Sequence, residues 1–279
     1  MTLIYEPKGK AREYSPLALN HYQGCDHGCR YCYVPKVMTN AKDYHHDQVK
    51  AREFSLIDLS WECRKGIYDQ VLLSFTTDPY HHTDQAIGLT RKVLEILVQN
   101  QVPVAILTKG GKRCLRDMDL FKQAGTLIKV GASLTYFNEE ESLKNEPGAA
   151  LPKDRLETLA ILHAEGITTW ASMEPVMDPV QSLTLIRHSL LFVDHYKIGK
   201  LNHEETGINW SLWLAASVSV LRRTGKPFYV KKDLHVFAGK AGVTLAPEEI
   251  DQDQLTLKRE RPVGPKVELP ETLPLFGAS

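Results

Sequence analysis

Short runs of β-branched and other apolar residues recur along the chain, separated by longer segments in which apolar positions follow helical spacing. Runs of this length and composition are typical of buried strands. The predicted strands are residues 17–22, 71–76, 102–108, 127–135, 168–173 and 195–198, with 228–231 as a further candidate.

The segments between these runs predict helices. Residues 86–100 and 155–165 place apolar side chains three or four positions apart, and Gly166 is expected to end the second segment. Asn209 can cap a third helix that carries Trp210 and Trp213, whose spacing indicates core packing. Because strand and helix alternate, we expect a parallel sheet.

Polar residues gather just after the predicted strand ends, at Thr77-Asp78, Thr108-Lys109, Thr135 and Glu174. Such a pattern favours an α/β fold built as a partial (β/α)6 TIM-like barrel, with the site at the carboxyl ends of the strands. A doubly wound open sheet is the alternative. It is disfavoured because no G-x-G-x-x-G or Walker-type glycine loop follows any strand.

Composition divides the chain into three parts. We expect an N-terminal extension over residues 1–15, the barrel core over 16–235 and a C-terminal extension over 236–279. The last part is predicted to be largely irregular because it is rich in charge and contains four prolines after position 261.

Charge and hydropathy exclude several classes of protein. Lys and Arg balance Asp and Glu at 34 each, so no general basic excess exists, and nucleic acid binding is allowed but not indicated. The longest uncharged run, residues 206–221, is shorter than the ~20 residues of a membrane span. The N-terminus lacks the pattern of a signal peptide, so we expect a cytoplasmic protein without membrane association.

The strongest chemical signal is a group of three cysteines directly after the first predicted strand. Cys25, Cys29 and Cys32 form a C-x3-C-x2-C loop, while the other two cysteines, Cys63 and Cys114, stand apart. Three thiolates on a short loop can bind three irons of an iron–sulfur cube and leave the fourth iron open for chemistry. A zinc knuckle that recruits His27 or Cys63 is the alternative. It is disfavoured because zinc ligands usually come in pairs.

Beyond this spacing, the chain resembles the radical S-adenosylmethionine superfamily, whose C-x3-C-x2-C signature has an aromatic residue before the last cysteine, here Tyr31. More narrowly, it is similar to the spore photoproduct lyase-like group. That likeness is carried by segments 5–14 and 20–33, by Thr77-Asp78-Pro79-Tyr80 and by Thr108-Lys109, and it extends over about residues 4–235.

The resemblance implies a [4Fe-4S] cluster on Cys25, Cys29 and Cys32, with S-adenosyl-L-methionine chelating the open iron. It also implies a flavodoxin- or ferredoxin-type reductant as electron donor. The residues that it assigns to S-adenosylmethionine are Tyr31 for the adenine, Thr77 and Asp78 for the amino group, Lys109 for the carboxylate, and Ser133, Thr135 and Glu174 as further contacts.

One position departs from the narrower group. In photoproduct lyases a cysteine stands three residues before the aspartate of the motif after the second strand and returns a hydrogen atom to the product radical. Phe75 occupies that position here, so repair by the lyase mechanism lacks its donor unless a tyrosine such as Tyr80 replaces it. Near the same motif, His81 is expected to face the substrate.

The leading hypothesis is therefore a radical S-adenosylmethionine enzyme that abstracts hydrogen from a substrate the sequence does not identify. Repair of a pyrimidine lesion in DNA is the alternative within enzyme chemistry. A non-catalytic iron–sulfur electron carrier or nucleic-acid-binding module is the alternative of another class.

Overall fold

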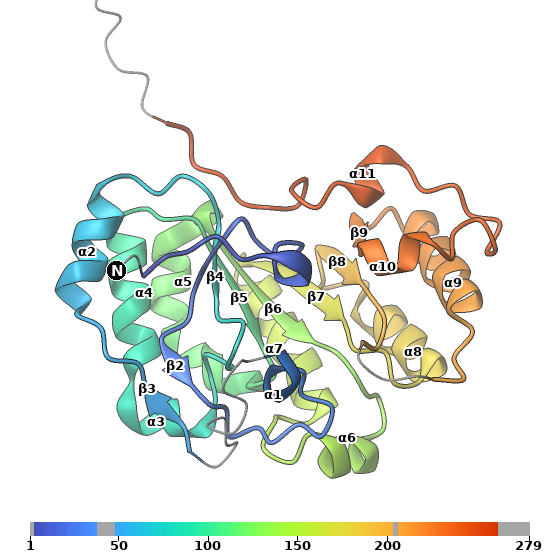
Figure 1. Ribbon diagram of the computed structural model, residues 1–279, viewed down its shortest axis with the longest axis horizontal. Coiled ribbons are helices and arrows are strands. Elements are labelled where there is room, and N and C mark those ends of the chain that lie inside the picture. The colour runs from blue at the N-terminus through green and yellow to red at the C-terminus, as the bar shows by residue number, and fades with distance from the viewer. Residues whose placement is uncertain (1–2, 38–47, 203–205, 262–279) are drawn as a thin grey trace, which may run out of the picture.

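A curled sheet of seven parallel strands forms the centre of the molecule (Figure 1). The computed structural model describes residues 3–37, 48–202 and 206–261. In spatial order the strands are β1 (Leu17–Leu19), β4 (Val71–Leu73), β5 (Val104–Thr108), β6 (Ile128–Ser133), β7 (Thr168–Met173), β8 (His195–Ile198) and β9 (Phe228–Val230).

Spatial order follows chain order throughout this sheet. Each crossover therefore runs in the same direction, as in a barrel, whereas a doubly wound sheet reverses direction partway across. This order excludes the open-sheet alternative and confirms the partial barrel of α/β type. The sheet has seven strands rather than six, because the weaker candidate at 228–231 is β9.

The two faces of the sheet differ in chemistry. Side chains alternate along each strand, so Val104 and Ile106 of β5 pack outward into the main apolar core while Ala105 faces inward with Trp170. Farther along the sheet the inward positions become polar, with Lys129, Ser133, Ser172, Lys197 and Tyr229. The inner face is therefore suited to a polar site, and the outer face to packing against helices.

Helices on the outside of the curved sheet cover its apolar face (Figure 1). The α-helices of six or more residues are α2 (Leu56–Arg64), α3 (His82–Ile87), α4 (Leu89–Gln99), α5 (Met118–Ala124), α6 (Glu139–Asn145), α7 (Pro152–Ala164), α8 (Pro179–Ser189) and α9 (Trp210–Arg223). Shorter elements are α1 (Val34–Val37), α10 (Lys232–His235), α11 (Pro247–Ile250), and the 3-10 turns η1 (Gly9–Ala11), η3 (Gly111–Asp117) and η4 (Gly125–Leu127). Strands β2 (Tyr22–Gln23) and β3 (Lys50–Ala51) form a separate small ribbon.

Several predicted boundaries are wrong, among them that of the strand 17–22, which the structure divides into β1 and β2, and two further errors have identifiable reasons. The helix predicted over 86–100 is split, because Gly88 has a left-handed backbone with φ of 67° and separates α3 from α4. The strand predicted over 71–76 ends at Leu73. Beyond it, side chains replace the strand ladder: Asn20 Oδ1 accepts the main-chain N–H of Phe75 at 2.8 Å, and Ser74 Oγ donates to the Leu19 carbonyl at 3.1 Å.

Both chain extensions pack against the barrel core. The N-terminal segment carries Tyr14 onto the inner face, where its ring lies 6.3 Å from Trp170, centroid to centroid. The C-terminal segment up to residue 261 contains α11 and is fastened by a bidentate ion pair between Arg12 and Asp253. Residues 262–279 of this extension lie outside the described residues. No helix among the described residues is long and apolar enough to cross a membrane.

Candidate functional site

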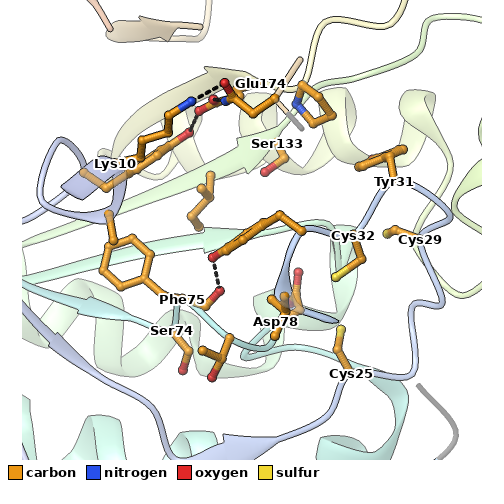
Figure 2. Close-up of a pocket in the computed structure, with 18 of the residues that line it drawn as sticks. Lys10, Cys25, Cys29, Tyr31, Cys32, Ser74, Phe75, Asp78, Ser133 and Glu174 are labelled. Atoms are coloured by element: carbon orange, nitrogen blue, oxygen red, sulfur yellow. Dashed lines mark hydrogen bonds between the residues drawn. The ribbon is translucent and has the colours of Figure 1, made fainter. Parts of the chain in front are cut away.

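A cavity of about 580 Å³ opens where the strands end at their carboxyl termini (Figure 2). The cysteine loop closes one end of it, and Cys25, Cys29 and Cys32 all line its wall. Thr77, Asp78, Lys109, Ser133, Glu174 and Tyr31 line the same cavity. The structure therefore brings together nine of the ten predicted site residues, and Thr135 lies behind the wall, fully buried.

The cysteine loop is held by the segment between α6 and α7. Arg30 donates its main-chain N–H to the Asn145 carbonyl at 2.9 Å, and Gly148 donates to the His27 carbonyl at 2.9 Å. A Cβ atom at Gly148 would lie 2.2 Å from the carbonyl oxygen of Asp26, so only glycine permits this approach. Main-chain contacts thus help to fix the position of the loop.

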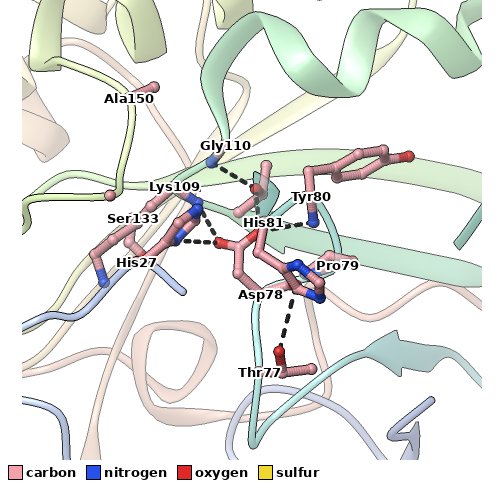
Figure 3. Close-up of polar contacts among 12 residues, drawn as sticks. His27, Thr77, Asp78, Pro79, Tyr80, His81, Lys109, Gly110, Ser133 and Ala150 are labelled. Carbon is pink, nitrogen blue, oxygen red and sulfur yellow. Dashed lines mark hydrogen bonds and ion pairs between the residues drawn. The ribbon is translucent and has the colours of Figure 1, made fainter. Parts of the chain in front are cut away.

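Asp78 is the centre of a buried hydrogen-bond group (Figure 3). Its Oδ1 accepts from the Tyr80 main chain at 2.8 Å and from Thr108 Oγ1 at 2.6 Å, and its Oδ2 accepts from the Lys109 main chain at 2.6 Å. His27 Nδ1 lies 3.5 Å from Oδ2. Burial alone would raise the pKa of Asp78, but His27 and these hydrogen bonds outweigh burial and lower it.

A second buried group links Tyr31 to Lys109. The Tyr31 hydroxyl donates to Glu146, which also pairs with Arg155 in a buried salt bridge. Lys109 Nζ lies 3.9 Å from Glu146 Oε1 and 5.3 Å from the centroid of the Tyr31 ring, and Thr135 Oγ1 lies 3.2 Å from the Tyr31 hydroxyl. Burial favours the neutral form of Glu146, but Arg155 and Lys109 together lower its pKa to about 2.

The thiols fit a multi-iron group better than a single ion. Burial raises the pKa of Cys25 to about 12 and that of Cys29 to about 11, with Lys109 acting in the opposite direction on Cys29. Such thiols need bound metal to become thiolates. Among the described residues, no three metal-ligating side chains converge on one point. In a cubane each thiolate binds its own iron, so three separated thiols on one cavity wall suit that donor set.

Glu174 lies across the cavity from the cysteines (Figure 2). Its carboxylate accepts from the Tyr14 hydroxyl at 2.6 Å, from Asn202 Nδ2 at 2.7 Å and from Lys231. Ser133, the last residue of β6, lies on the wall between the two ends. Glu174 is therefore tied to a different set of side chains from those that surround the thiols.

Phe75 lies on the cavity wall, where the Tyr33 hydroxyl donates to its carbonyl at 2.6 Å. Tyr80 is not positioned as a hydrogen donor, because its buried hydroxyl donates to Asp117 at 3.0 Å, away from the cavity. The expectation that His81 faces the substrate is also wrong. Its buried ring caps α3 by accepting from the Asp84 main chain at 3.1 Å.

The two remaining cysteines do not line the cavity. Cys63 on α2 and Cys114 on η3 are buried among the apolar residues of the main core. His27 does line the cavity, but its ring is already engaged, because Nδ1 lies 3.5 Å from Asp78 Oδ2 and Nε2 accepts from Arg113 at 2.8 Å. A zinc knuckle built from the loop and either Cys63 or His27 therefore finds no support in the arrangement of the described side chains.

The sequence analysis did not assign several residues to the site, among them Tyr14, Glu146, Arg155 and Lys231. The sequence does indicate that Arg155 is buried and paired. It shares a helix face with Leu159 and Leu162, at spacings of four and three, and a charge on an apolar face needs a partner. Glu146 precedes a Pro-Gly turn, which gives no sign of burial.

The sequence matches the family model of the radical SAM superfamily over residues 19–190, which is more than half of the chain. The chain belongs to the radical SAM superfamily. Membership implies an enzyme that uses a [4Fe-4S] cluster and S-adenosylmethionine, and the cavity with its three thiols lies largely inside the matched region.

Relatives in sequence include an uncharacterized protein of Methanocaldococcus jannaschii. It is 31% identical over 191 residues, which cover 66% of this chain and 70% of that protein. An uncharacterized protein of Mycobacterium bovis is 28% identical over 57% of this chain and 49% of its own length. Neither protein's name states a substrate.

Two solved structures share the fold. A mutant of spore photoproduct lyase superposes with a TM-score of 0.57 at 13% identity, covering 81% of this chain and 64% of that one. SuiB of Streptococcus suis, solved with S-adenosylmethionine, gives a TM-score of 0.56 at 11% identity over 82% of this chain and 53% of that one. At 13% and 11% identity this likeness shows the fold alone, and the chain spans less than two thirds of either structure.

Proposed function

We propose that the chain is an enzyme that holds a [4Fe-4S] cluster on Cys25, Cys29 and Cys32 and abstracts a hydrogen atom from a substrate in the cavity. The observation that carries this proposal is the placement of all three thiols at one end of a single cavity, within the superfamily match. The bound cluster, once reduced, would cleave S-adenosylmethionine to methionine and a 5′-deoxyadenosyl radical.

The residues beside the thiols are suited to bind S-adenosylmethionine. Lys109 brings a cation to the cavity wall, where it can meet the methionine carboxylate through a charge-assisted hydrogen bond. Tyr31 next to it offers its main chain to the adenine. The Thr77 hydroxyl donates to the Asp78 carbonyl at 3.5 Å and can still accept from the amino group. Both carboxylate oxygens of Asp78 already accept hydrogen bonds, and Oδ2 holds the main chain of Lys109 in place.

The positions of the three further candidate residues suit contact with S-adenosylmethionine to different degrees. These residues are Ser133, Thr135 and Glu174. Ser133 lines the cavity, so it is suited to a ribose hydroxyl. Thr135 contacts the Tyr31 hydroxyl, which supports an indirect role through that ring. Glu174 is tied to Tyr14, Asn202 and Lys231, so it is better suited to shape the substrate end.

The apolar part of the cavity wall would help to keep bulk water from the radical. Phe75, Leu72 and Leu107 supply this apolar surface. A phenyl ring at position 75 gives no weak X–H bond, and among the described residues the only thiols on the cavity wall are the three of the loop. This arrangement supports hydrogen abstraction without the thiol-dependent return step, and it argues against repair of pyrimidine lesions by the lyase mechanism.

The test is reductive cleavage of S-adenosylmethionine by the anaerobically reconstituted chain. Dithionite should yield 5′-deoxyadenosine, and a flavodoxin- or ferredoxin-type reductant should replace dithionite. The Cys29→Ala variant is the matched control and should yield none. A chain that holds its cluster but forms no 5′-deoxyadenosine would instead be an electron carrier or a binding module.

A further inference from the structure

Positive charge is in excess on the cavity wall. Among the described residues five lysines line it, namely Lys8, Lys10, Lys109, Lys200 and Lys231, against two carboxylates, Asp78 and Glu174. Both carboxylates already accept hydrogen bonds from the chain. Because the protein as a whole has no net charge, this excess is a local property of the cavity.

The end of the cavity opposite the cysteines is built from two loops. Turn η1 lies on one side and residues 199–202, which follow β8, on the other. Lys10 donates to Asn202 and pairs with Asp233 of α10 at 3.0 Å. Figure 2 shows Lys10 and Phe75 away from Cys25 and Cys29. The two contacts of Lys10 connect turn η1 to both segments.

Two lysines at this end have no anionic partner among the described residues. Lys8 is exposed and takes part in no ion pair within that part of the chain. Lys200 Nζ donates to the Leu201 carbonyl at 3.2 Å and lies 5.8 Å from the centroid of the Trp210 ring, and neither group is anionic. Lys10, Lys109 and Lys231, by contrast, each face a carboxylate.

The cations on the cavity wall indicate which chemical class of ligand the cavity can bind. The described lining residues include five lysines and no arginine, and lysine acts as a point charge that is a common phosphate ligand. Leu72, Phe75 and Leu107 add apolar surface to the same cavity wall. A ligand with a phosphate at one end and an apolar body is complementary to these lysines and to this apolar surface.

The geometry points to a small phosphorylated molecule as the substrate, with its phosphate bound by Lys8 and Lys200 and its carbon skeleton lying along Phe75 toward the cysteine end. This inference rests on the proposed function, because it names the substrate class of that cavity. Confinement of the charge to a cavity, in a protein without net charge, favours a small molecule over a nucleic acid strand.

The test measures binding to the reconstituted full chain with S-adenosylmethionine present, by calorimetry at fixed ionic strength. Phenyl phosphate is the probe, with benzoate and a ten-nucleotide single-stranded DNA as competitors. We expect one phenyl phosphate per chain, and at least ~5-fold weaker binding in Lys8→Ala and in Lys200→Ala, since each removes a hydrogen bond to a charged group. Lys153→Ala, on the exposed part of α7, is the charge-matched control and should bind like the wild type.

Several results would overturn the inference. These are the absence of phenyl phosphate binding, equal binding of benzoate, tighter binding of the oligonucleotide that depends on the same two lysines, or an equal loss in Lys153→Ala. Wild-type formation of 5′-deoxyadenosine separates the two proposals. If it occurs without phenyl phosphate binding, the proposed function stands and the substrate class is wrong. If phenyl phosphate binds but no 5′-deoxyadenosine forms, the proposed function fails instead.

Discussion

The two ends of the cavity differ in how their charged side chains are paired and buried. At the cysteine end, Glu146 and Arg155 are fully buried and neutralise each other, and Tyr31 and Lys109 are packed against them. At the other end Lys8 is exposed, Lys10 is half exposed, and Lys200 faces no carboxylate among the described residues.

The difference shows how one cavity can serve two purposes. A cofactor that is always the same can be held by side chains fixed in advance through buried networks, which lowers the cost of ordering them on binding. A substrate must enter and leave, so its charged group is better met by exposed side chains that remain solvated until it arrives. We expect substitutions at the two ends to differ accordingly.

The largest expected effect is loss of the cluster. Cys25→Ala, Cys29→Ala and Cys32→Ala should each abolish it, because each removes the protein ligand of one iron. Iron content should fall from about four per chain in the wild type, together with the brown absorbance. Cys63→Ala and Cys114→Ala should keep the cluster, since both side chains belong to the apolar core. Loss of the cluster in Cys63→Ala would indicate a closed four-ligand site.

The next effect is on stability. Arg155→Met leaves the buried carboxylate of Glu146 without its main partner, so the free energy of unfolding should fall by about 3–5 kcal/mol. Lys200→Met at the other end should change it by less than ~0.5 kcal/mol, because this half-buried lysine has no carboxylate partner among the described residues. Urea unfolding of both variants is the measurement.

The double variant Glu146→Gln/Arg155→Met is the matched control for that comparison. It removes both charges and should recover part of the stability that Arg155→Met loses. Equal losses in Arg155→Met and Lys200→Met would show that the two ends do not differ as described.

The sequence predicted the fold and the identity of the cavity residues better than their connections. Strand runs and polar strand ends are local signals, and β7 (Thr168–Met173) was predicted to the residue. The Glu146–Arg155 pair could not be predicted, because nothing in a single chain specifies which acid meets a helical arginine. The roles expected for Tyr80 and His81 failed for a related reason. The turn after Asp78 directs both side chains into the core.

Acid should lower the stability of the fold through the buried side chain of His21. Burial lowers the pKa of His21 to about 4, with His81 acting in the same direction and Asp84 against it, while Ser74 and Thr90 contact its ring. The unfolded chain takes up this proton below about pH 6.5, but the folded chain does so only near pH 4. Stability from this residue is thus complete above pH 6.5, and about 2–3 kcal/mol is lost between pH 6.5 and 4.

Urea midpoints at several pH values in this window measure the effect. His21→Gln should reduce the slope of the free energy of unfolding against pH by the amount that corresponds to the uptake of about one proton. Lys200→Met should leave the slope unchanged. An unaltered slope in His21→Gln would show that the ring is not kept neutral by burial.

A smaller effect is expected at Lys109, on binding rather than on folding. Lys109→Ala should weaken S-adenosylmethionine binding by about 1.5–3 kcal/mol, the usual contribution of a hydrogen bond to a charged group. The cluster should survive, because the three thiols remain. Equilibrium binding of S-adenosylmethionine to the reconstituted variant measures this change. Wild-type affinity in Lys109→Ala would assign the carboxylate to another cation of the cavity.

The central claim is that three thiols leave one iron open to S-adenosylmethionine at the cysteine end. The electron paramagnetic resonance spectrum of the reduced cluster, recorded with and without S-adenosylmethionine, tests this claim most directly. We predict a clear change in the spectrum on addition, because the ligand of the open iron changes. An identical spectrum, at a concentration where S-adenosylmethionine is shown to bind, would contradict it and would mean that the chain closes the fourth position itself.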